Sequence, residues 1–412
     1  MTLKPDSRYA FLFIFITVLL DMVGFGLIIP VQPALISQVG GTDIARASEI
    51  GGFMFFAFSF AQFLCGPTLG NLSDAYGRRP LLLLAVFGLG CDYLITAMAP
   101  SIGWLFVGRT LAGVCGASYV IANAFIADIT PPEGRAKAFG MMGAAFGLGF
   151  VIGPAIGGLL GAFGPRVPFY VAAFISLLNF VFGYFILPET LPPEKRRKLD
   201  WARANPVGTF KIFRSYRQVW PLSGVVALYF FATSVYPATW AYWSTAKFGW
   251  NSTMIGVTLA AFGILMAITQ GLLTGPLVKR FGEWALAIAG MISSPLGCLV
   301  FAFAPGLGVV IIGLFIHAPE GFAHPMLGAI MSKEVPEDAQ GELQGGMSAI
   351  MNISMMFGTI FYAAAFAYFM RPNPIVVSAS ACFIIAAAVM TLALLLLLFV
   401  AKPLHERYVA QN

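Results

Sequence analysis

The sequence predicts an all-α integral membrane protein with twelve membrane-spanning helices in two halves of six. Of its 412 residues, 59% are hydrophobic and only 10% are charged, and the mean hydropathy is +0.84. An ordinary soluble domain is about one quarter charged. Apolar runs of about 20 residues, the length that crosses a bilayer as a helix, recur from Phe11 to Ala401. They are longer than the alternating strands of a β-barrel and continuously apolar.

Breaks rich in charge, glycine or proline separate the runs, and each run can satisfy its own backbone hydrogen bonds in lipid as a helix. The expected spans are residues 9–33, 51–72, 81–99, 103–126, 138–163, 168–188, 218–243, 253–277, 285–304, 308–331, 342–368 and 375–401. The first span lacks a small-residue cleavage site, so we expect it to be retained rather than removed as a signal peptide. The five cysteines lie within spans without metal-ligand or redox spacing, which favours packing roles.

Lysine and arginine fall unevenly between the two sets of loops. The side that bears both termini, with the link between the sixth and seventh spans, holds nineteen of them. The opposite side holds five, namely Arg46, Arg109, Arg166, Lys247 and Arg371. Because basic loops stay in the cytoplasm, we expect both termini to be cytoplasmic. The net charge of +6 needs no nucleic-acid partner, since its bulk lies where anionic lipid headgroups attract it.

A basic link divides the chain. We expect an N-terminal six-helix bundle at residues 1–188, a cytoplasmic basic linker at 189–217 and a C-terminal six-helix bundle at 218–412. A weak repeat supports this division, because GNLSDAYG at 70–77 and GPLVKRFG at 275–282 share Gly, Leu, an aromatic residue and Gly at matching places. Two parallel halves around a central site are a common plan among transporters.

Several strings carry a more specific pattern. They are GNLSDAYGRRPLLL from Gly70, GRTLAG at 108–113, FGLGFVIGPAIGGLLG at 146–161, LLDMVGFGLIIPVQPAL in the first span, GCDYL at 90–94, FGWNSTMIGVTLAAFG from Phe248 and GELQG at 341–345. In this order the chain resembles the major facilitator superfamily, in its drug:proton antiporter branch and close to the bacterial tetracycline efflux pumps. The resemblance implies a monomeric, multi-pass protein of the bacterial inner membrane. It would exchange a small amphipathic drug, tetracycline-like compounds included, for protons, without a cofactor or a bound metal.

The string in the fifth span resembles the antiporter motif, carried here by Gly149, Gly153, Pro154, Gly157 and Gly158. The glycines remove side chains along one face, which permits close helix approach, and the proline permits a bend. Ordinary packing glycines would have the same composition. The resemblance favours a role in sealing the cytoplasm-facing conformation.

Three charged residues fall near the cytoplasmic helix ends: Asp74, Arg78 and Asp128. Such groups can form a latch that breaks when a transporter opens inward, although solvated loop charges would look the same. Ala75 departs from the family, which usually has a basic residue there, so part of the expected charge network is missing.

Acidic residues within spans are the best candidates for proton coupling. A charge at the bilayer centre costs roughly 2.5–3.5 kcal/mol, so Asp21 and Asp92 should face a cavity, where a desolvated carboxyl group can take and release protons. Both match acidic positions of the tetracycline pumps. Arg109 suits pairing with an acid, or snorkelling to the outer interface. Asn123 and Gln270 offer uncharged groups to a substrate or to their neighbours.

The second half departs from the tetracycline pumps. Met266 and Ser293 stand about where those pumps carry a histidine and an aspartate. The carboxylate deep within a span of this half is instead Glu320, with His317 and His324 on the same face of a continuous helix that a proline should kink. We expect Glu320 to couple protons or contact substrate and the histidines to contact substrate, or all three to form a structural hydrogen-bonded group.

Alternatives remain. The same three side chains could ligate a divalent ion in an exporter of a metal or metal chelate, and the fold could export another amphipathic metabolite or a lipid. A sensor or scaffold is disfavoured because little chain is left outside the spans. An enzyme is disfavoured because HAPEGFAH is not the HExxH zinc pattern and no nucleophile stands beside a base.

Overall fold

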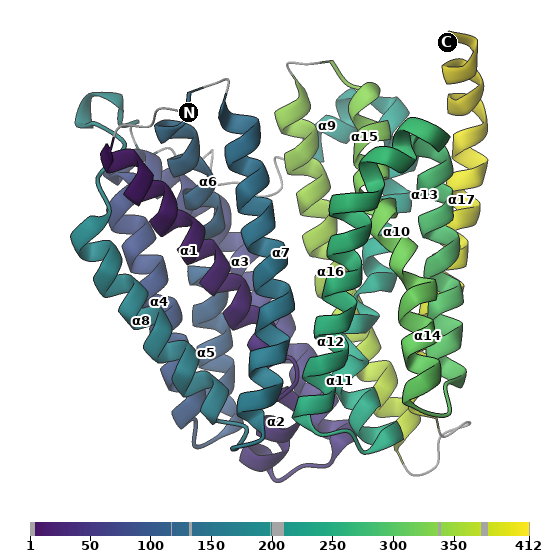
Figure 1. Cartoon of the computed structure of the whole chain (residues 1–412), viewed down its shortest axis with the longest axis horizontal. Helices are drawn as coiled ribbons and strands as arrows, with labels where there is room; N and C mark the ends of the chain where they lie inside the picture. Colours follow the sequence, from purple (N-terminus) through teal and green to yellow (C-terminus); the bar gives the residue numbers. More distant parts are fainter. Residues whose placement is uncertain are drawn as a thin grey trace. The chain divides into compact units, whose positions relative to one another are not determined.

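The computed structural model describes residues 5–116, 118–131, 134–197, 199, 210–336, 339–371 and 378–411, and every regular element in them is a helix (Figure 1). Ten helices in this part of the chain are long and apolar enough to cross a membrane. One of them covers 52 residues, Ser252–Phe303, far more than the roughly 20 residues of a single crossing. The chain is an all-helical, multi-pass membrane protein.

The twelve expected spans correspond to the observed helices, except that the eighth and ninth form one continuous stretch and the fourth, seventh and tenth are each divided. The 52-residue stretch consists of α12 (Ser252–Ala267), the π-helical turn η6 (Ile268–Leu273) and α13 (Thr274–Phe303). Gly282 has φ 80° and ψ 165° within α13, a conformation that interrupts the helix and that glycine adopts without strain. The stretch therefore holds the eighth and ninth expected spans. The fourth is divided into α5 (Ile102–Cys115) and α6 (Ser118–Ile129).

One compact unit comprises Met1–Asp43, Phe53–Pro206 and Trp250–Ala260. Besides α5 and α6, its helices are α1 (Pro5–Ile28), the short α2 (Gln32–Gly40), which the sequence did not predict, most of α3 (Ile44–Tyr76), α4 (Arg78–Met98), α7 (Arg135–Gly161) and α8 (Val167–Ile186). α1 packs along α7, and α4 packs along α8 and α5. Fully buried side chains from four helices form its core, Phe13, Leu82, Phe125 and Met142 among them.

The second unit comprises Ile44–Gly52, Val207–Gly249 and Ala261–Asn412. Besides α13, its helices include α9 (Lys211–Ser215), α10 (Trp220–Thr233), α11 (Val235–Phe248), α14 (Leu307–His317), the 3-10 turn η7 (Ala318–Phe322), α15 (Ala323–Lys333), α16 (Gln340–Met370) and α17 (Ala381–Gln411). α10 packs on α16 and α17, and α13 packs on α14, η7 and α15. The buried side chains of Val226, Met291 and Leu327 belong to its core.

The bundles expected at 1–188 and 218–412 stay a prediction, because α3 and α12 each contribute residues to both compact units. Much of the linker expected at 189–217 lies outside the described residues, as do Lys4, Lys198 and Arg203, three of the basic residues used to predict the orientation.

Candidate functional site

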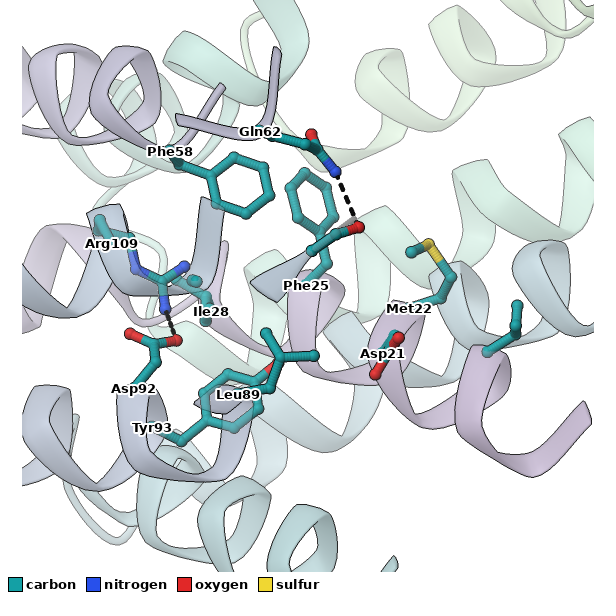
Figure 2. A pocket seen from close by; sticks show the side chains of 13 residues that line it. Asp21, Met22, Phe25, Ile28, Phe58, Gln62, Leu89, Asp92, Tyr93 and Arg109 are labelled. Carbon is teal, nitrogen blue, oxygen red and sulfur yellow. Dashed lines mark hydrogen bonds and ion pairs between the residues drawn. The ribbon is translucent and has the colours of Figure 1, made fainter. Parts of the chain in front are cut away.

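A cavity lies within the first unit, lined by α1, α3, α4 and α5 (Figure 2). Most of its lining is apolar or aromatic, with Phe25, Phe58 and Tyr93 among the residues that face it. Phe25 and Phe58 also contact each other, with ring centroids 6.1 Å apart. The ionisable or amide side chains in the lining are Asp21, Gln62, Asp92 and Arg109. An apolar cavity with a few convergent polar groups is the usual form of a small-molecule site.

Asp92 and Arg109 form a buried ion pair in this lining. Arg109 Nη2 lies 2.7 Å from Asp92 Oδ2, and the Thr96 hydroxyl lies 3.2 Å from the other carboxylate oxygen and donates to it. The Asp92 side chain is 0% exposed and the Arg109 side chain 9%. Gly108 makes room for the pair, because a Cβ there would lie 2.8 Å from Asp92 Oδ1. Two charges that would be costly alone in a membrane therefore neutralise each other.

Asp21 lines the same cavity from α1, where it is half buried. The structure thus brings together Asp21, Asp92 and Arg109, three of the four residues that the sequence singled out for proton coupling. Gln62, which the sequence analysis did not single out, joins them and donates from Nε2 to the Gly116 carbonyl at 3.2 Å (Figure 2). The sequence feature that could have identified Gln62 is a single amide side chain within an apolar span.

The glycines of α7 hold the Asp21-bearing helix at backbone contact. A Cβ on Gly149 would lie 2.7 Å from the Leu19 carbonyl oxygen, and one on Gly153 would lie 2.6 Å from that of Val23. Gly157 continues this ridge against Leu27, where a Cβ would lie 2.7 Å from Cα. Glycines four residues apart on one helix face permit this approach, and a larger residue at any of them would push the two helices apart.

The other residues of the motif face α1 and the start of α12. Pro154 lies inside α7, and its ring packs at Gly26 of α1, where a Cβ would lie 2.6 Å from Pro154 Cδ. A Cβ on Gly158 would lie 3.0 Å from the Cα of Gly256. Within the first unit, these five residues of the sequence motif therefore serve close packing on two neighbours.

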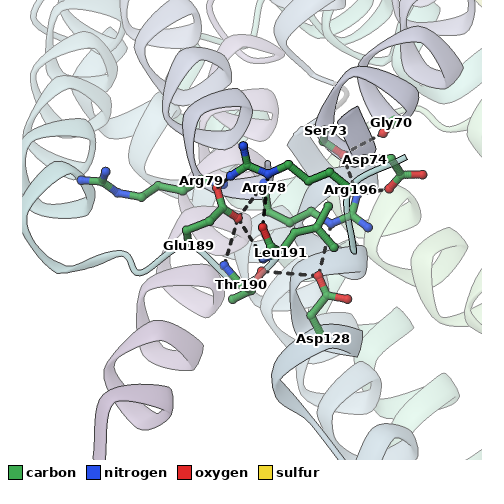
Figure 3. A network of polar contacts seen from close by, with 10 residues as sticks. All are labelled: Gly70, Ser73, Asp74, Arg78, Arg79, Asp128, Glu189, Thr190, Leu191 and Arg196. Atoms are coloured by element: carbon green, nitrogen blue, oxygen red, sulfur yellow. Dashed lines mark hydrogen bonds and ion pairs between the residues drawn. The ribbon is translucent and has the colours of Figure 1, made fainter. Parts of the chain in front are cut away.

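A network of polar contacts joins α3, α4 and α6 at one end of the first unit (Figure 3). Arg78 pairs with Asp74 and also with Asp128, whose Oδ2 lies 3.2 Å from Arg78 Nε. Arg78 also donates to the Ser73 hydroxyl at 2.7 Å. The three residues expected to form a latch are thus in one network, with Arg78 bridging two carboxylates.

Glu189 completes this network and was missed from the sequence. Its carboxylate accepts from the backbone N–H groups of Arg78 at 2.9 Å and Arg79 at 3.4 Å, so it caps the start of α4. Gly77 permits this approach, since it has φ 109° and a Cβ there would contact Glu189. Glu189 also lies 3.9 Å from Arg196 of the linker. The sequence feature that could have identified Glu189 is its position next to the basic linker. Its contact with the start of α4, about 110 residues away, cannot be predicted from sequence spacing.

Asn123 and Gln270 do not join the cavity. Asn123 is half buried on α6 and is not one of the residues lining the cavity of the first unit. Gln270 is exposed in η6 of the second unit. The predicted substrate-binding role of these two amides stays a prediction.

The tenth expected span is interrupted in its middle. Pro319 lacks an amide N–H, and the chain passes from α14 through the 3-10 turn η7 to α15. A 3-10 turn advances roughly 120° per residue against 100° in an α-helix, so His317 and Glu320 are eclipsed. Over the five residues of η7, this turns His324 by roughly 100° away from its place on a continuous helix.

The contacts of the three side chains agree with this rotation. His317 is buried and its Nε2 lies 4.0 Å from Glu320 Oε2. His324 is instead exposed, and its ring packs edge-on against Phe230 with centroids 5.1 Å apart. The expectation that all three share one face holds for a continuous helix, and the 3-10 turn removes His324 from it.

Two residues of the second half depart from the family pattern: Met266 lies beside this turn, and Ser293 lies on α13, which packs against the turn. A Cβ on Gly321 would lie 3.0 Å from Met266 Sδ. Ser293 is buried in α13 and donates to the Gly290 carbonyl at 2.9 Å, and a Cβ on Gly290 would lie 2.9 Å from the Pro319 carbonyl oxygen. Among the described residues, no group of three or more His, Cys, Asp or Glu side chains is placed to hold a metal ion. The metal alternative therefore gains no support from the contacts of these histidines.

Comparisons with known proteins agree on the family. A sequence profile of the Major Facilitator Superfamily matches residues 14–244 and 222–411. The chain is 40% identical over 361 residues to the tetracycline resistance protein, class C, of Escherichia coli, covering 88% of this chain and 90% of that protein. It is 28% identical over 358 residues to multidrug resistance protein 2 of Bacillus subtilis (strain 168), covering 86% and 88%.

A solved structure supports the fold independently. The crystal structure of a bacterial homologue of the human lysosomal transporter Spinster, inward-facing and occupied, matches with a TM-score of 0.79 at 16% identity, over 97% of this chain and 98% of that one. With two halves matching one profile and the whole length matching the fold, this chain is a member of the Major Facilitator Superfamily.

Proposed function

We propose that this protein is a proton-coupled exporter of amphipathic drugs, tetracycline-like compounds among them, that works by alternating access. It acts as a monomer in the bacterial inner membrane with both termini in the cytoplasm. The names of the relatives support the substrate class, since they include tetracycline and multidrug resistance proteins. Enzymatic activity is not part of the proposal.

One observation carries the proposal, namely the cavity of the first unit that joins an aromatic lining to Asp21 and the Asp92–Arg109 pair. The apolar lining receives the body of an amphipathic molecule, and the polar groups orient it. A proton taken up by Asp92 removes the negative charge that balances Arg109. The guanidinium, which keeps its charge, must then find another acceptor. Protonation and occupancy of the cavity are thereby linked.

The network around Arg78 supplies the two-state element that alternating access requires. Its ion pairs link three helices and, through Glu189, the start of the linker. Such pairs can form in one conformation and break in the other. Asp74, Arg78 and Asp128 are thus proposed as the cytoplasmic latch, with Glu189 as a fourth member. The glycine ridge of α7 keeps α1 in register during this change.

The test is transport by purified protein in proteoliposomes with an imposed pH gradient and a panel of compounds that includes tetracycline. Wild type should accumulate at least one compound only when the gradient is present. Asp21→Asn and Asp92→Asn should lose gradient-driven uptake and keep binding. Asp43→Asn, an exposed residue outside the cavity, is the matched control and should transport normally.

Two results would count against the proposal. Uptake that is independent of the pH gradient would indicate a facilitator of a metabolite or a lipid. Full gradient-driven uptake by both aspartate variants would refute the coupling role of these residues.

A further inference from the structure

We propose that Glu320 and His317 form a second proton-binding site, inside the second unit, in which one proton is shared between the two side chains and two tyrosines hold them in place. The proposal rests on the proposed function, in which protons drive export. It assigns His317 to the proton rather than to the substrate, and it adds Tyr229 and Tyr236 as positioning residues.

The two side chains are adjacent and removed from solvent. The Glu320 side chain is 8% exposed and the His317 side chain 0%. Glu320 Oε2 and His317 Nε2 are 4.0 Å apart, and Nε2 is a buried nitrogen without a hydrogen-bond partner. A buried polar atom that lacks a partner is costly. Here a carboxylate oxygen stands 4.0 Å from it, beyond hydrogen-bond distance.

The backbone imposes this arrangement. Because η7 is a 3-10 turn, residues three apart point in the same direction, which brings His317 and Glu320 together. A continuous α-helix would set them roughly 60° apart. Pro319 lies between them and lacks the N–H that an α-helical turn would use. The proline thus fixes the geometry of the pair.

Two tyrosines contact the remaining polar atoms of the pair, Glu320 Oε1 and His317 Nδ1. The Tyr229 hydroxyl, from α10, donates to Glu320 Oε1. The Tyr236 hydroxyl, from α11, lies 3.3 Å from His317 Nδ1 and 3.1 Å from Cys298 Sγ. The His317 ring is also stacked on Phe262, with centroids 5.7 Å apart and an angle of 27° between planes. These contacts fix both side chains and leave Oε2 and Nε2 facing each other.

The titratable groups that face the pair come from three helices: Tyr229 of α10, Tyr236 of α11 and Cys298 of α13. α12 and η6 contribute Phe262, Met266 and Thr269, which do not titrate. Among the described residues, no lysine or arginine is paired with Glu320. The carboxylate therefore lacks a fixed counter-ion, in contrast to Asp92, and a proton is the cation that can neutralise it.

The proposed step moves a single proton. In the empty state Glu320 is a carboxylate and His317 a neutral imidazole. One proton from water binds between Oε2 and Nε2, and the gap closes from 4.0 Å to about 2.8 Å, the length of a charge-assisted hydrogen bond. Release returns the same proton to water, and no other bond forms or breaks. Since His317 ends α14 and Glu320 lies within η7, proton binding also tightens the break between α14 and α15.

The experiment measures protons released into weakly buffered detergent solution when tetracycline is added to purified protein, across a range of pH. Glu320→Gln should release about one proton fewer per transporter than wild type. Tyr229→Phe loses a hydrogen bond to the ionised carboxylate, so its release profile should move to more alkaline pH by about one to two units. His317→Phe keeps the stacked ring but cannot share the proton, so its profile should move to more acid pH.

Tyr242→Phe is the matched control, since Tyr242 is buried in α11 with a hydroxyl that has no hydrogen-bond partner. Its profile should match that of wild type. Release from Glu320→Gln equal to wild type overturns this site alone, as do Tyr229→Phe and His317→Phe profiles that move no more than the control. A wild type that binds tetracycline without releasing protons overturns the proposed function and this site together.

Discussion

Replacing Arg109 by methionine should destabilise the protein strongly, and more so at alkaline pH. The change keeps the aliphatic stem but leaves the Asp92 carboxylate, whose side chain is 0% exposed, with Thr96 as its remaining donor. Removing one partner of a buried pair costs about 3–5 kcal/mol, because the charge that stays behind is not compensated.

Proton uptake by Asp92 limits that cost and makes it depend on pH. An aspartic acid in water titrates near pH 3.9, about 3 pH units below pH 7. Each pH unit corresponds to about 1.36 kcal/mol, so protonating the carboxylate at pH 7 costs roughly 4 kcal/mol. The folded variant then binds one more proton than the unfolded chain. Its stability relative to wild type therefore falls by about 1.4 kcal/mol for each unit that pH rises, and it recovers as pH falls toward 4.

The assay is denaturant or thermal unfolding of the purified protein in detergent at pH 5, 6, 7 and 8. Arg46→Met is the matched control, because the Arg46 side chain is 60% exposed in its pair with Glu49, and it should cost less than about 1 kcal/mol without a slope in pH. Adding Asp92→Asn to Arg109→Met should restore most of the stability, since no buried charge is left. Arg109→Met as stable as wild type at pH 8 would refute the reasoning.

Three further predictions follow from other contacts. Gly157→Ala should lower the unfolding temperature, because its methyl group would lie 2.7 Å from a Cα of α1. The control Gly147→Ala, whose methyl group would meet nothing within 4 Å, should leave the unfolding temperature unchanged or raise it. Equal effects of the two variants would contradict the close packing of α7 on α1. Glu189→Ala should cost about 1–2 kcal/mol of unfolding free energy through loss of the α4 cap and should speed tryptic cleavage of the linker, with exposed Glu194→Ala as the inert control. Phe58→Ala should weaken tetracycline binding in equilibrium titrations, while the number of protons released at saturating tetracycline stays the same. Unchanged affinity would place the substrate outside this cavity.

The spans and the polar candidates within them follow from local properties of the sequence. An apolar run of sufficient length forms a helix in lipid whatever surrounds it. The expected spans therefore agree with the observed helices apart from α2, the joining of the eighth and ninth spans, and the breaks within the fourth, seventh and tenth. An acid within such a run is costly, which is why Asp21, Asp92 and Glu320 were recognisable as candidates. The glycines of α7 were also recognisable as a packing face, because their spacing along the sequence is enough to place them on one side of a helix.

The hydrogen-bond and ion-pair partners of these residues do not follow from local sequence, because they depend on which helices pack together. Glu189 caps α4 across 111 residues of chain, and Tyr229 donates to Glu320 across 91. No spacing rule connects such residues. The sequence therefore offered Arg109 as a partner for some acid and could not select Asp92. It offered His317 and Glu320 of the tenth expected span but not the tyrosines that contact them.

The sequence by itself determined that this protein is a helical membrane protein, which ionisable groups it holds within the membrane and to which family it is similar, because hydropathy and motifs are read residue by residue. Only the tertiary structure decided how those groups are combined. It paired Asp92 with Arg109 beside Asp21, and it joined His317 to Glu320 while turning His324 away. The physical reason is that hydrogen bonds need atoms within about 3 Å and ion pairs within about 4 Å, and those distances are set by helix packing and by one 3-10 turn at a proline.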